Sequence, residues 1–483
     1  MSPVSVEKAE KQASPMWIGG EPVRTSSTQT IRLPYDGTPV GEVYEADDVI
    51  VDQAITAAQA GARAMAALTL YERAELLERM RQLLARDVEE FARLISGESG
   101  KPIREARAEA ERSQQTLLAS ADAARSLHGE TIPLDAAPAG KGRMAMTVRE
   151  PLGVIVAITP FNFPLNLALH KVGPAFAAGN SVIHKPSENT PLSALRLARL
   201  IQEAGAPAGA YNVVTGAGET VGERLVSDER VAMITFTGSV AVGKRIRAKA
   251  GLRRVSLELG NNSAVIVEPD ADLDTIVPRC VTGGFSHSGQ VCISVQNVYL
   301  HEQVASKFTQ MFVGKTRALK VGPPLEDSTE VSSLINVEQA ERVKSWIDAA
   351  VKEGARLLTG GARRHATIEP AILDDAPPHV DVCSKEVFGP VVVLHRYRNL
   401  DDAIAEINSG PYGLQVGVCT QDIGRAFRAA RELQFGGVMV NDVPAYRVDH
   451  MPYGGAKSSG IGREGPRYAV EEMTELKLIC WRA

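Results

Sequence analysis

Three residues in this sequence have side chains that could take part in catalysis, and each stands in an unusual local setting. Cys292 lies in a Gly/Ser-rich loop before a predicted strand at 296–300, where a cysteine is either a reactive thiol or a small structural residue. Glu258 stands inside an apolar strand, and burial gives such a carboxyl group a raised pKa that suits a general base. Asn162 follows another buried strand, where an amide N–H could face a developing oxyanion. Their joint occurrence points to catalysis.

Two glycine-rich segments, 213–218 and 235–243, follow predicted strands and open predicted helices. Backbone N–H groups and the helix dipole at such junctions could hold a pyrophosphate. Neither segment has the complete G-x-G-x-x-G spacing, so tight turns that need glycine explain them equally well. Lys185 and Glu188 follow a further strand, where they could bind an adenosine ribose or simply belong to a solvated loop.

The composition is that of a globular protein of enzyme size. The 483 residues are 44% hydrophobic and 23% charged, and this length suggests two or three lobes. With 53 basic and 58 acidic residues the net charge is −5, which argues against nucleic acid or an anionic membrane as the partner. The sequence shows no apolar run of roughly 18 residues and no apolar signal stretch, so we expect a cytoplasmic protein. Five scattered cysteines without a Cys-x-x-Cys pair predict no disulfide framework and no metal site.

Hydrophobic periodicity, together with residues that end helices or form turns, predicts the elements that position these side chains. Residues up to about 14 form a loose tail, and 47–127 carry helical periodicity with a stop and restart at Gly-Lys-Pro 100–102. Residues 128–150 predict a projecting β-hairpin, and the final stretch from 475 predicts an isolated strand.

From residue 151 onward, strands and helices alternate. The run 151–159 is continuously apolar, as expected for a parallel strand that is buried on both faces. Thr190 and Pro191 predict the N-cap and first turn of the helix that follows a second strand. Further short strands predict βαβ units and a doubly wound sheet, and a second α/β series follows at about 270–445.

From about residue 20 to its end, the sequence resembles the aldehyde dehydrogenase superfamily. The motifs that carry this resemblance are TPFNFP (159–164), HKPSENTP (184–191), FTGSVAVG (236–243), LELG (257–260), SGQVC (288–292), EVFGP (386–390) and PYGGAKSSGIGRE (452–464). The order and number of these motifs make the resemblance highly specific.

The resemblance implies a role for each catalytic candidate. Cys292 would attack the aldehyde carbon, Glu258 would activate water for deacylation, and the Asn162 amide with the Cys292 N–H would form the oxyanion hole. Lys171 and Glu464 match a proton-release path. The positions that match cofactor contacts are Thr159, Pro160, Lys185, Glu188, Gly216, Gly238, Ser239, Val242, Gly260, Glu386 and Phe388. A carboxylate at 188 would repel a 2′-phosphate, so NAD is expected rather than NADP.

The family fold that the resemblance implies has three parts. A Rossmann-like cofactor domain would comprise 15–127 and 151–257, and an α/β catalytic domain would comprise 258–447. The segments 128–150 and 466–483 would form an oligomerisation element that joins subunits into a homodimer or homotetramer. The family usually has glycine where this chain has Asn261, a change that is tolerable if residue 261 has a positive φ.

The sequence indicates the substrate less closely than it indicates the reaction. Asn166 and His170 make the pocket entrance polar, Ile293 adjoins the nucleophile, and Arg112 and Arg447 match positions where some branches bind anionic aldehydes. An arginine fork suits a phosphonate, sulfonate or carboxylate, which favours a short, polar and anionic aldehyde. The alternative is that Arg112 is a surface charge and Arg447 part of a structural ion pair.

Several other functions compete with this interpretation. A broad-range aliphatic aldehyde dehydrogenase is one alternative, and a coenzyme-A-acylating enzyme is another, although the acylating branch typically lacks the counterpart of Glu258. A catalytically silent relative would be expected to lose Cys292, Glu258 or Asn162, and all three are present. A thiol hydrolase that uses no nucleotide is the last alternative.

Overall fold

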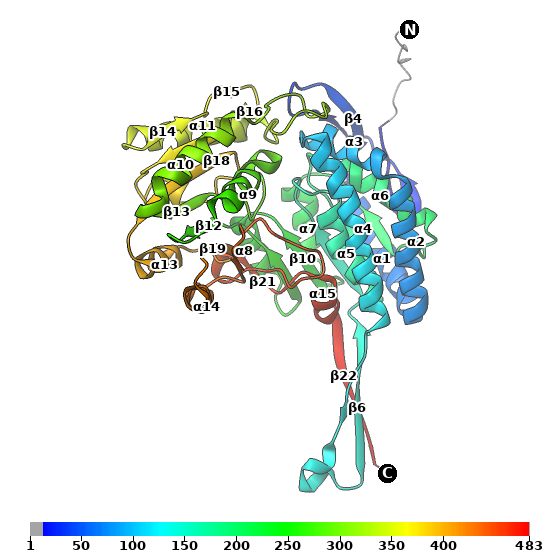
Figure 1. Ribbon diagram of the computed structural model, residues 1–483. Coiled ribbons are helices and arrows are strands. Elements are labelled where there is room, and N and C mark those ends of the chain that lie inside the picture. The colour runs from blue at the N-terminus through cyan, green and yellow to red at the C-terminus, as the bar shows by residue number, and fades with distance from the viewer. Residues whose placement is uncertain (1–12, 483) are drawn as a thin grey trace.

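The computed structural model describes residues 13–482, which fold into two α/β lobes and a long arm (Figure 1). The predicted N-terminal tail lies almost entirely outside the described residues. Within the described range, no helix has the length and apolar character needed to cross a membrane.

The first lobe contains an eight-stranded sheet with five parallel strands at its centre. In spatial order these are β9 (Tyr211–Val213), β8 (Ser181–Lys185), β7 (Val154–Ile158), β10 (Met233–Thr237) and β11 (Arg254–Glu258). Numbered along the chain, this order is 3-2-1-4-5, which confirms the predicted doubly wound sheet. The strands β1 (Met16–Ile18), β2 (Glu21–Val23) and β21 (Gly460–Ile461) extend the sheet at its edges, and β3 (Thr28–Arg32) pairs with β4 (Pro39–Tyr44) nearby.

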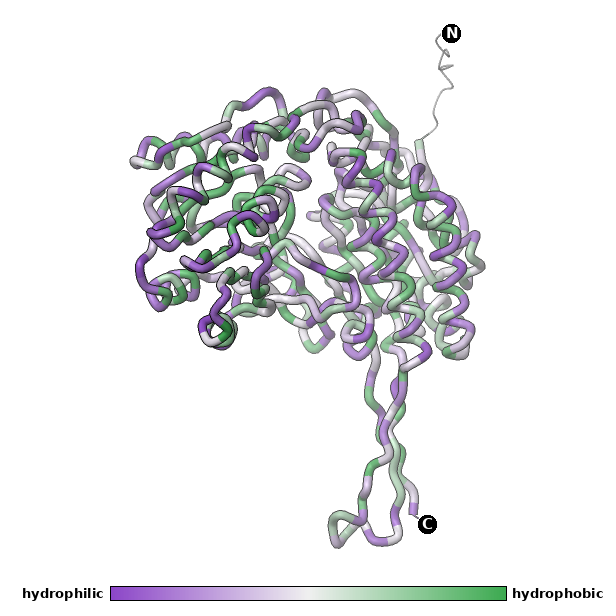
Figure 2. The backbone as a smooth tube through the Cα atoms, in the orientation of Figure 1, coloured by the Kyte–Doolittle hydropathy of each residue, from purple (hydrophilic) through white to green (hydrophobic). Residues whose placement is uncertain are grey.

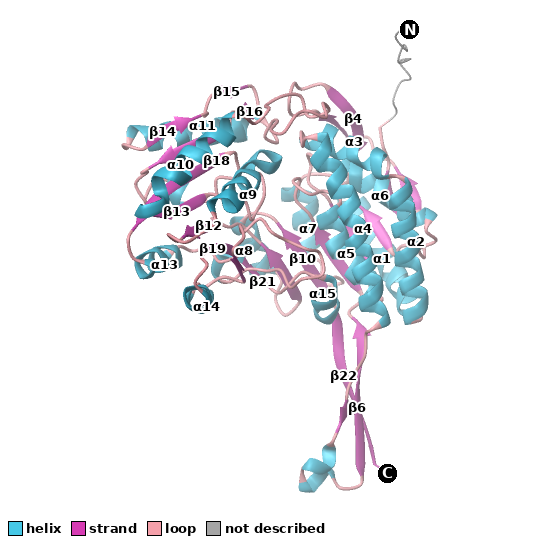
Figure 3. Ribbon diagram, viewed as in Figure 1, coloured by secondary structure: helices cyan, strands magenta, loops and turns pink. Residues whose placement is uncertain are grey.

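Helices cover both faces of this sheet (Figure 3). They are α1 (Asp48–Ala67), α2 (Leu70–Arg86), α3 (Val88–Ser99), α4 (Ile103–Arg125), α5 (Asn166–Ala178), α6 (Pro191–Glu203), α7 (Glu223–Ser227) and α8 (Val240–Lys249). The helical periodicity of 47–127 is thus confirmed, and the predicted stop is Gly100, whose φ of 72° ends α3 in the left-handed region.

Thr190 and Pro191 stand at the N-cap and in the first turn of α6, which confirms their prediction. The Thr190 hydroxyl, however, makes no capping hydrogen bond. The buried carboxylate of Glu98 instead accepts the N–H groups of Leu192 at 2.7 Å and Ser193 at 3.2 Å. Burial raises the pKa of Glu98 to about 8, while these two N–H groups oppose the rise. The side-chain oxygens satisfy donors that are free at a helix N-terminus, so a distant residue takes over the hydrogen bonds of a local cap.

The second lobe contains a seven-stranded sheet that is parallel except at one edge. In spatial order its strands are β14 (Arg356–Thr359), β17 (Ala371–Asp374), β18 (Val391–Tyr397), β13 (Asn297–His301), β12 (Ala264–Val267), β19 (Gln415–Cys419) and β20 (Gly437–Val440), and only β14 is antiparallel. Its helices are α9 (Leu273–Phe285), α10 (Glu302–Arg317), α11 (Val337–Lys352), α12 (Asp381–Ser384), α13 (Leu400–Ser409) and α14 (Ile423–Glu432), and β15 (Arg363–Arg364) pairs with β16 (Thr367–Ile368). This is the predicted second α/β series.

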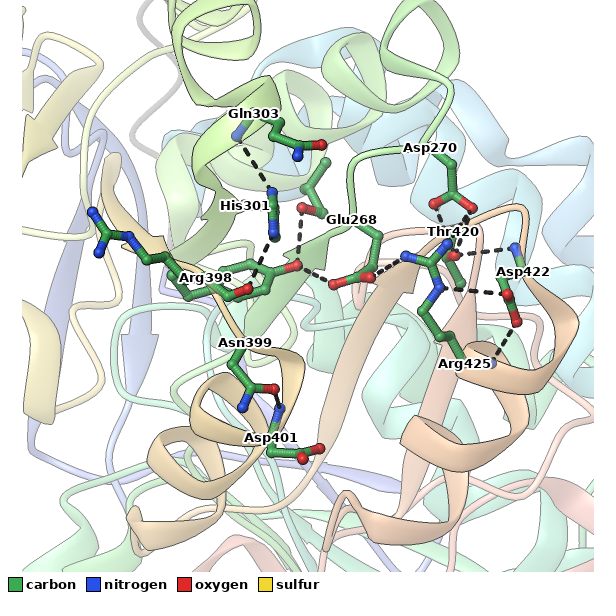
Figure 4. A network of polar contacts seen from close by, with 12 residues as sticks. Glu268, Asp270, His301, Gln303, Arg398, Asn399, Asp401, Thr420, Asp422 and Arg425 are labelled. Atoms are coloured by element: carbon green, nitrogen blue, oxygen red, sulfur yellow. Dashed lines mark hydrogen bonds and ion pairs between the residues drawn. The ribbon is translucent and has the colours of Figure 1, made fainter.

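A polar network fastens α14 to the ends of strands in the second sheet. The Arg425 guanidinium contacts the carboxylates of Glu268 and Asp270, and Thr420 also donates to Asp270 at 2.9 Å (Figure 4). The buried hydroxyl of Tyr397 donates to the backbone carbonyl of Val267 at 3.1 Å. These charges are paired and lie among strand ends, so they stabilise the lobe.

The arm consists of a nearly continuous antiparallel ladder. The strands β6 (Arg143–Pro151) and β22 (Thr474–Arg482) pair along nine residues, and β5 (Thr131–Ile132) pairs with the far end of β6. Both the predicted hairpin and the predicted final strand are therefore confirmed, and α15 (Pro466–Glu472) leads into the arm (Figure 1). Apolar and polar residues alternate along it (Figure 2), and several large apolar side chains are exposed on it, including Leu478 at 58%.

A buried ion pair fixes the start of α5, the helix that carries several predicted site residues. Lys101 and Glu109 are both buried, and the ammonium group pairs with the carboxylate. The second oxygen of Glu109 accepts the N–H groups of Leu165 at 3.0 Å and Asn166 at 3.1 Å. The ammonium also lies 3.8 Å from the centroid of the Phe163 ring. The pair therefore holds the segment that follows Asn162.

We expect Lys101→Met to lower the free energy of unfolding by about 3 kcal/mol, because it leaves the buried Glu109 carboxylate without its counter-charge. Urea denaturation of the full chain at a fixed protein concentration measures this loss. Arg93→Met is the matched control, because Arg93 pairs with Glu89 at 3.3 Å on the exposed surface of α3. Equal urea midpoints for the two variants would contradict the structural role of the buried pair.

Candidate active site

The loop before Cys292 has an unusual backbone conformation. His287, Ser288 and Gly289 have φ values of 47°, 56° and 71°, so three consecutive residues are left-handed. A β-carbon at Gly289 would lie only 2.2 Å from the carbonyl oxygen of Gly389, which explains the glycine. The amide Nδ2 of Asn162 donates to the carbonyl of Gln290 at 2.9 Å and keeps a second N–H. The structure therefore brings the predicted amide to the loop of the predicted thiol.

Cys292 is half-buried, and its Sγ lies 2.8 Å from the hydroxyl of Tyr453. Burial raises the pKa of the Cys292 thiol to about 12, while the hydrogen bond with Tyr453 and the charge of Arg447 oppose this rise. The negative charges of Glu386 and Glu258 act in the same direction as burial and raise the pKa of the thiol further. The thiol thus needs nearby donors or cations to ionise at neutral pH.

Glu258, the last residue of β11, is 3% exposed. Neither of its carboxylate oxygens has a hydrogen-bond partner among residues 13–482. Burial raises the pKa of Glu258 well above its usual range, and repulsion from Glu464 raises it further. A β-carbon at Gly454 would lie 2.9 Å from Oε1, so this carboxylate packs directly against a glycine. An unpartnered carboxylate of this kind suits a general base.

Glu464 is equally buried but is fully paired. Its Oε1 accepts from the ammonium of Lys171 at 2.9 Å, and its Oε2 accepts from the guanidinium of Arg447 at 3.1 Å. Although burial acts against ionisation, these two cations lower the pKa of Glu464 to about 2. Lys171 also donates to Thr235 at 3.2 Å. The structure therefore joins the two residues of the predicted proton path in one buried ion pair.

A cavity of about 490 Å³ opens beside Cys292. Its wall includes Arg112, Phe163, Asn166, Leu167, Arg279, Val291, Ile293, Val443, Ala445, Tyr446, Arg447 and Tyr453. Three of these side chains are arginines, and no carboxylate from residues 13–482 lines the cavity. The predicted residues Arg112, Asn166, Ile293 and Arg447 thus share one wall with the thiol. Each guanidinium is also paired with a carboxylate, Arg112 with Asp449, Arg279 with Asp442 and Arg447 with Glu464, so the wall offers guanidinium N–H donors rather than an excess of positive charge.

The buried carboxylate of Asp449 organises the back of this cavity. It accepts from Arg112 at 2.8 Å, from Asn166 at 3.1 Å and from His170 at 2.9 Å. Although burial acts against ionisation, the hydrogen bond from His170 and the charge of Arg112 lower the pKa of Asp449. His170 is itself buried and lies behind the wall of the cavity. It is not one of the residues that line the cavity. Its part in shaping the entrance is therefore indirect.

A second cavity, of about 440 Å³, lies at the carboxyl ends of β7, β8 and β10. Its lining includes six predicted cofactor residues, namely Thr159, Pro160, Lys185, Glu188, Gly238 and Val242. Glu188 accepts the N–H of Gly218 at 2.7 Å, and burial lowers the pKa of Lys185. Ligands of doubly wound sheets bind at this edge. A β-carbon at Gly238 would lie 2.4 Å from Cζ of Phe236, which explains the glycine. The residues present therefore fit a dinucleotide.

The remaining predicted cofactor residues lie outside this cavity. Gly216 has a φ of 137°, and Ser239 caps α8 by accepting the N–H of Val242. Glu386 packs against Gly260, where a β-carbon would lie 2.5 Å from its Oε2. Phe388 contacts Phe161, which lines the cavity, with the ring centroids 5.7 Å apart.

Burial raises the pKa of Glu386 to about 7, while its carboxylate accepts the N–H of Asn261 at 3.0 Å. Asn261 does not have a positive φ, so the condition under which asparagine is tolerable there is not met. The asparagine fits for another reason, because its Nδ2 donates to Ser263 Oγ at 2.6 Å and to the carbonyl of Gln415 at 3.2 Å.

Comparison with known proteins identifies the family of the chain that contains these two cavities. Residues 23–479 match the profile described as the Aldehyde dehydrogenase family. The chain belongs to the aldehyde dehydrogenase family. It is therefore an aldehyde-oxidising oxidoreductase of a family that uses a nicotinamide cofactor.

Individual relatives cover nearly the whole enzyme. A 3-sulfolactaldehyde dehydrogenase of Priestia megaterium is 47% identical over 464 residues, which are 96% of this chain and 97% of that protein. The crystal structure of aldehyde dehydrogenase 21 from Physcomitrella patens, in complex with the reaction product succinate, has a TM-score of 0.95 at 38% identity and covers 98% of both chains. An NADP-dependent glyceraldehyde-3-phosphate dehydrogenase from Bacillus halodurans, complexed with NADP, has a TM-score of 0.95 at 34% identity, with 98% of this chain and 100% of that chain covered.

The sequence did not predict a role for three residues of the enzyme's active site. Tyr453 lies within a quoted motif, but 161 residues separate it from Cys292. Asp449 stands two residues after Arg447, but the sequence does not indicate which side chains contact its carboxylate. Arg279 lies in α9 and pairs with Asp442 across the lobe, at 2.7 Å from Nε to Oδ1. In each case the functional position depends on a long-range contact.

We expect Gly260→Ala to raise the KM for the nicotinamide cofactor by about tenfold, because the new methyl group displaces the Glu386 carboxylate and overpacking of this size costs 1–3 kcal/mol. Initial rates at saturating aldehyde measure this change. Gly314→Ala in α10 is the control, because a β-carbon there meets no atom within 4 Å. An unchanged cofactor KM in Gly260→Ala would separate Glu386 from cofactor binding.

Proposed function

We propose that the enzyme catalyses NAD-dependent oxidation of a short, anionic aldehyde to its carboxylic acid. The observation that carries this proposal is the cavity beside Cys292, which has three arginines and no carboxylate on its wall within residues 13–482. Two relatives support it, because one is named for 3-sulfolactaldehyde and another was crystallised with succinate. A guanidinium that binds an anion forms strong, charge-assisted hydrogen bonds.

The proposed first step is addition of the Cys292 thiolate to the aldehyde carbon. A sulfur–carbon bond forms, and the carbonyl electron pair moves to oxygen. The second N–H of the Asn162 amide and the backbone N–H of Cys292 would stabilise this oxyanion by a few kcal/mol per donor. When bound, the nicotinamide cofactor supplies a hydride acceptor, and hydride loss leaves a thioester on Cys292.

Glu258 would carry the second half of the reaction. Its unpartnered carboxylate would take a proton from a water molecule, which then attacks the thioester and releases the carboxylic acid. Lys171 and Glu464 would pass protons onward, supported by their buried pair at 2.9 Å. The presence and setting of Glu258 favour hydrolysis over transfer to coenzyme A.

The cofactor cavity supports NAD over NADP. Lys185 and Glu188 would bind the adenosine ribose, and the Glu188 carboxylate would repel a 2′-phosphate. Lys249 and Arg245 also line this cavity, but both lie beside the carboxylate of Glu223, which offsets their charge. Gly216, Gly238 and Ser239 would face the diphosphate, and Glu386 with Phe388 the nicotinamide riboside. Thr159, Pro160, Val242 and Gly260 would complete the wall.

The arm supports a homodimer or homotetramer. Its exposed apolar side chains include Met144 at 53%, Leu476 at 53% and Trp481 at 40%, which is more than a monomer of this kind normally leaves uncovered. We assign 128–150 and 466–483 to this oligomerisation element. The cofactor domain would then comprise 15–127 and 151–257, and the catalytic domain 258–447.

We expect Arg112→Gln to lower kcat/KM for succinate semialdehyde, 3-sulfolactaldehyde or phosphonoacetaldehyde by 10- to 100-fold, because a hydrogen bond to a charged group contributes about 1.5–3 kcal/mol. The rate with hexanal should stay within about twofold. NADH absorbance with each aldehyde, run with NAD and NADP in parallel, measures both preferences. Arg93→Gln on the exposed face of α3 is the control. A tenfold preference of the wild-type enzyme for hexanal would rule out the anionic substrate.

We expect Glu258→Gln to lower kcat by roughly 10²- to 10⁴-fold, the usual contribution of a general base, while the first turnover still releases NADH. In the wild-type enzyme kcat should rise with pH through the raised pKa of Glu258, because the base is protonated below that pKa. Stopped-flow absorbance separates the burst from the steady state. Strong acceleration by coenzyme A, together with an unaffected Glu258→Gln variant, would identify an acylating enzyme instead.

A further inference from the structure

The hydroxyl of Tyr453 forms a hydrogen bond with the sulfur of Cys292, at 2.8 Å. Tyr453 is only 2% exposed, and Ile293 and Leu414 pack beside it. The phenol makes no other hydrogen bond to the described residues. Within the described residues, no other group therefore competes for this hydroxyl.

Two further contacts fix the position of this phenol. The Arg447 guanidinium lies over the ring of Tyr453, with Cζ 3.7 Å from the centroid. It also pairs with Glu464 and lies 3.3 Å from Nε2 of His170. The backbone of Tyr453 pairs with that of Glu464 in both directions, at 3.0 and 2.6 Å. A cation over the ring face attracts its electrons and makes the hydroxyl a better donor.

The direction of the hydrogen bond follows from the acidity of the two groups. Burial raises the pKa of Tyr453 well above its usual value, and the negative charge of an ionised Cys292 raises it further, so the phenol keeps its proton. A thiolate has no proton to give. Whenever the sulfur is ionised, the phenol is therefore the donor.

We propose that Tyr453 is a catalytic residue that donates its hydroxyl hydrogen to the sulfur of Cys292 and thereby favours the nucleophilic thiolate. This rests on the proposed function, in which that sulfur attacks the aldehyde. The thiol proton leaves to solvent through the open cavity, the sulfur–carbon bond forms, and the phenol keeps its proton throughout. As the sulfur loses its charge in this step, its hydrogen bond weakens.

The expected size of the effect follows from the chemistry of thiols. Loss of a hydrogen bond to a charged group should raise the pKa of the Cys292 thiol by about one unit. A tenfold smaller thiolate fraction is partly offset because a more basic thiolate is a stronger nucleophile. The net loss in reactivity at neutral pH is about threefold for each unit.

The test is the pH profile of alkylation of Cys292 by iodoacetamide in the full-length enzyme without aldehyde. Mass spectrometry of the peptide that carries Cys292 is needed, because Cys480 is exposed and also reacts. We expect Tyr453→Phe to shift the midpoint upward by about one unit. Tyr446→Phe is the matched control, because this tyrosine lines the same cavity, is 44% exposed and lies away from the sulfur. Its midpoint should match that of the wild-type enzyme.

A second variant keeps the test available if Tyr453→Phe does not fold. Incorporation of 3,5-difluorotyrosine at position 453 makes the phenol more acidic and a stronger donor, so the midpoint should shift downward. A wild-type midpoint in both variants, or a downward shift in Tyr453→Phe, would overturn the proposal. Wild-type aldehyde oxidation by Cys292→Ser would instead overturn the proposed function and leave the alkylation result interpretable.

Discussion

The pairing of the buried carboxylate of Glu464 is the interaction on which the active site most depends. Lys171 approaches it from α5 of the first lobe, and Arg447 approaches it from the loop that follows β20 in the second lobe. A charge in such a setting is stable only when its counter-charges are held in place. The ion pairs therefore fix the position of the Arg447 guanidinium, and with it the ring of Tyr453.

Glu258 and Glu464 lie near each other but have opposite environments. Glu464 has the two cations, which keep it ionised, whereas Glu258 packs against Gly454 without any hydrogen-bond partner among residues 13–482. Two neighbouring carboxyl groups whose pKa values are moved apart in this way can take different roles. In the resting enzyme Glu464 is therefore ionised and paired with its cations, whereas Glu258 is the carboxyl group that suits proton exchange with water.

Much of the fold follows from local patterns. The continuous apolar runs predicted the parallel strands, because strands buried on both faces need apolar residues throughout. Helical periodicity and Gly100 predicted α1 to α4 and the end of α3. Local patterns did not show which distant residues satisfy these elements. The free N–H groups at the start of α6 donate to Glu98, and Asn261 donates to the carbonyl of Gln415, so long-range hydrogen bonds complete what the local pattern began.

The sequence by itself determined the family, the doubly wound sheet, and the residue types of the thiol, the carboxylate and the amide. Motifs and periodicities are local, so they survive without knowledge of the packing. Only the tertiary structure decided which groups touch. It placed Tyr453 on Cys292 across 161 residues, and it gave Arg112, Asn166 and His170 one shared carboxylate, Asp449. Such contacts depend on how two lobes and one connecting loop pack, and no spacing along the chain encodes that packing.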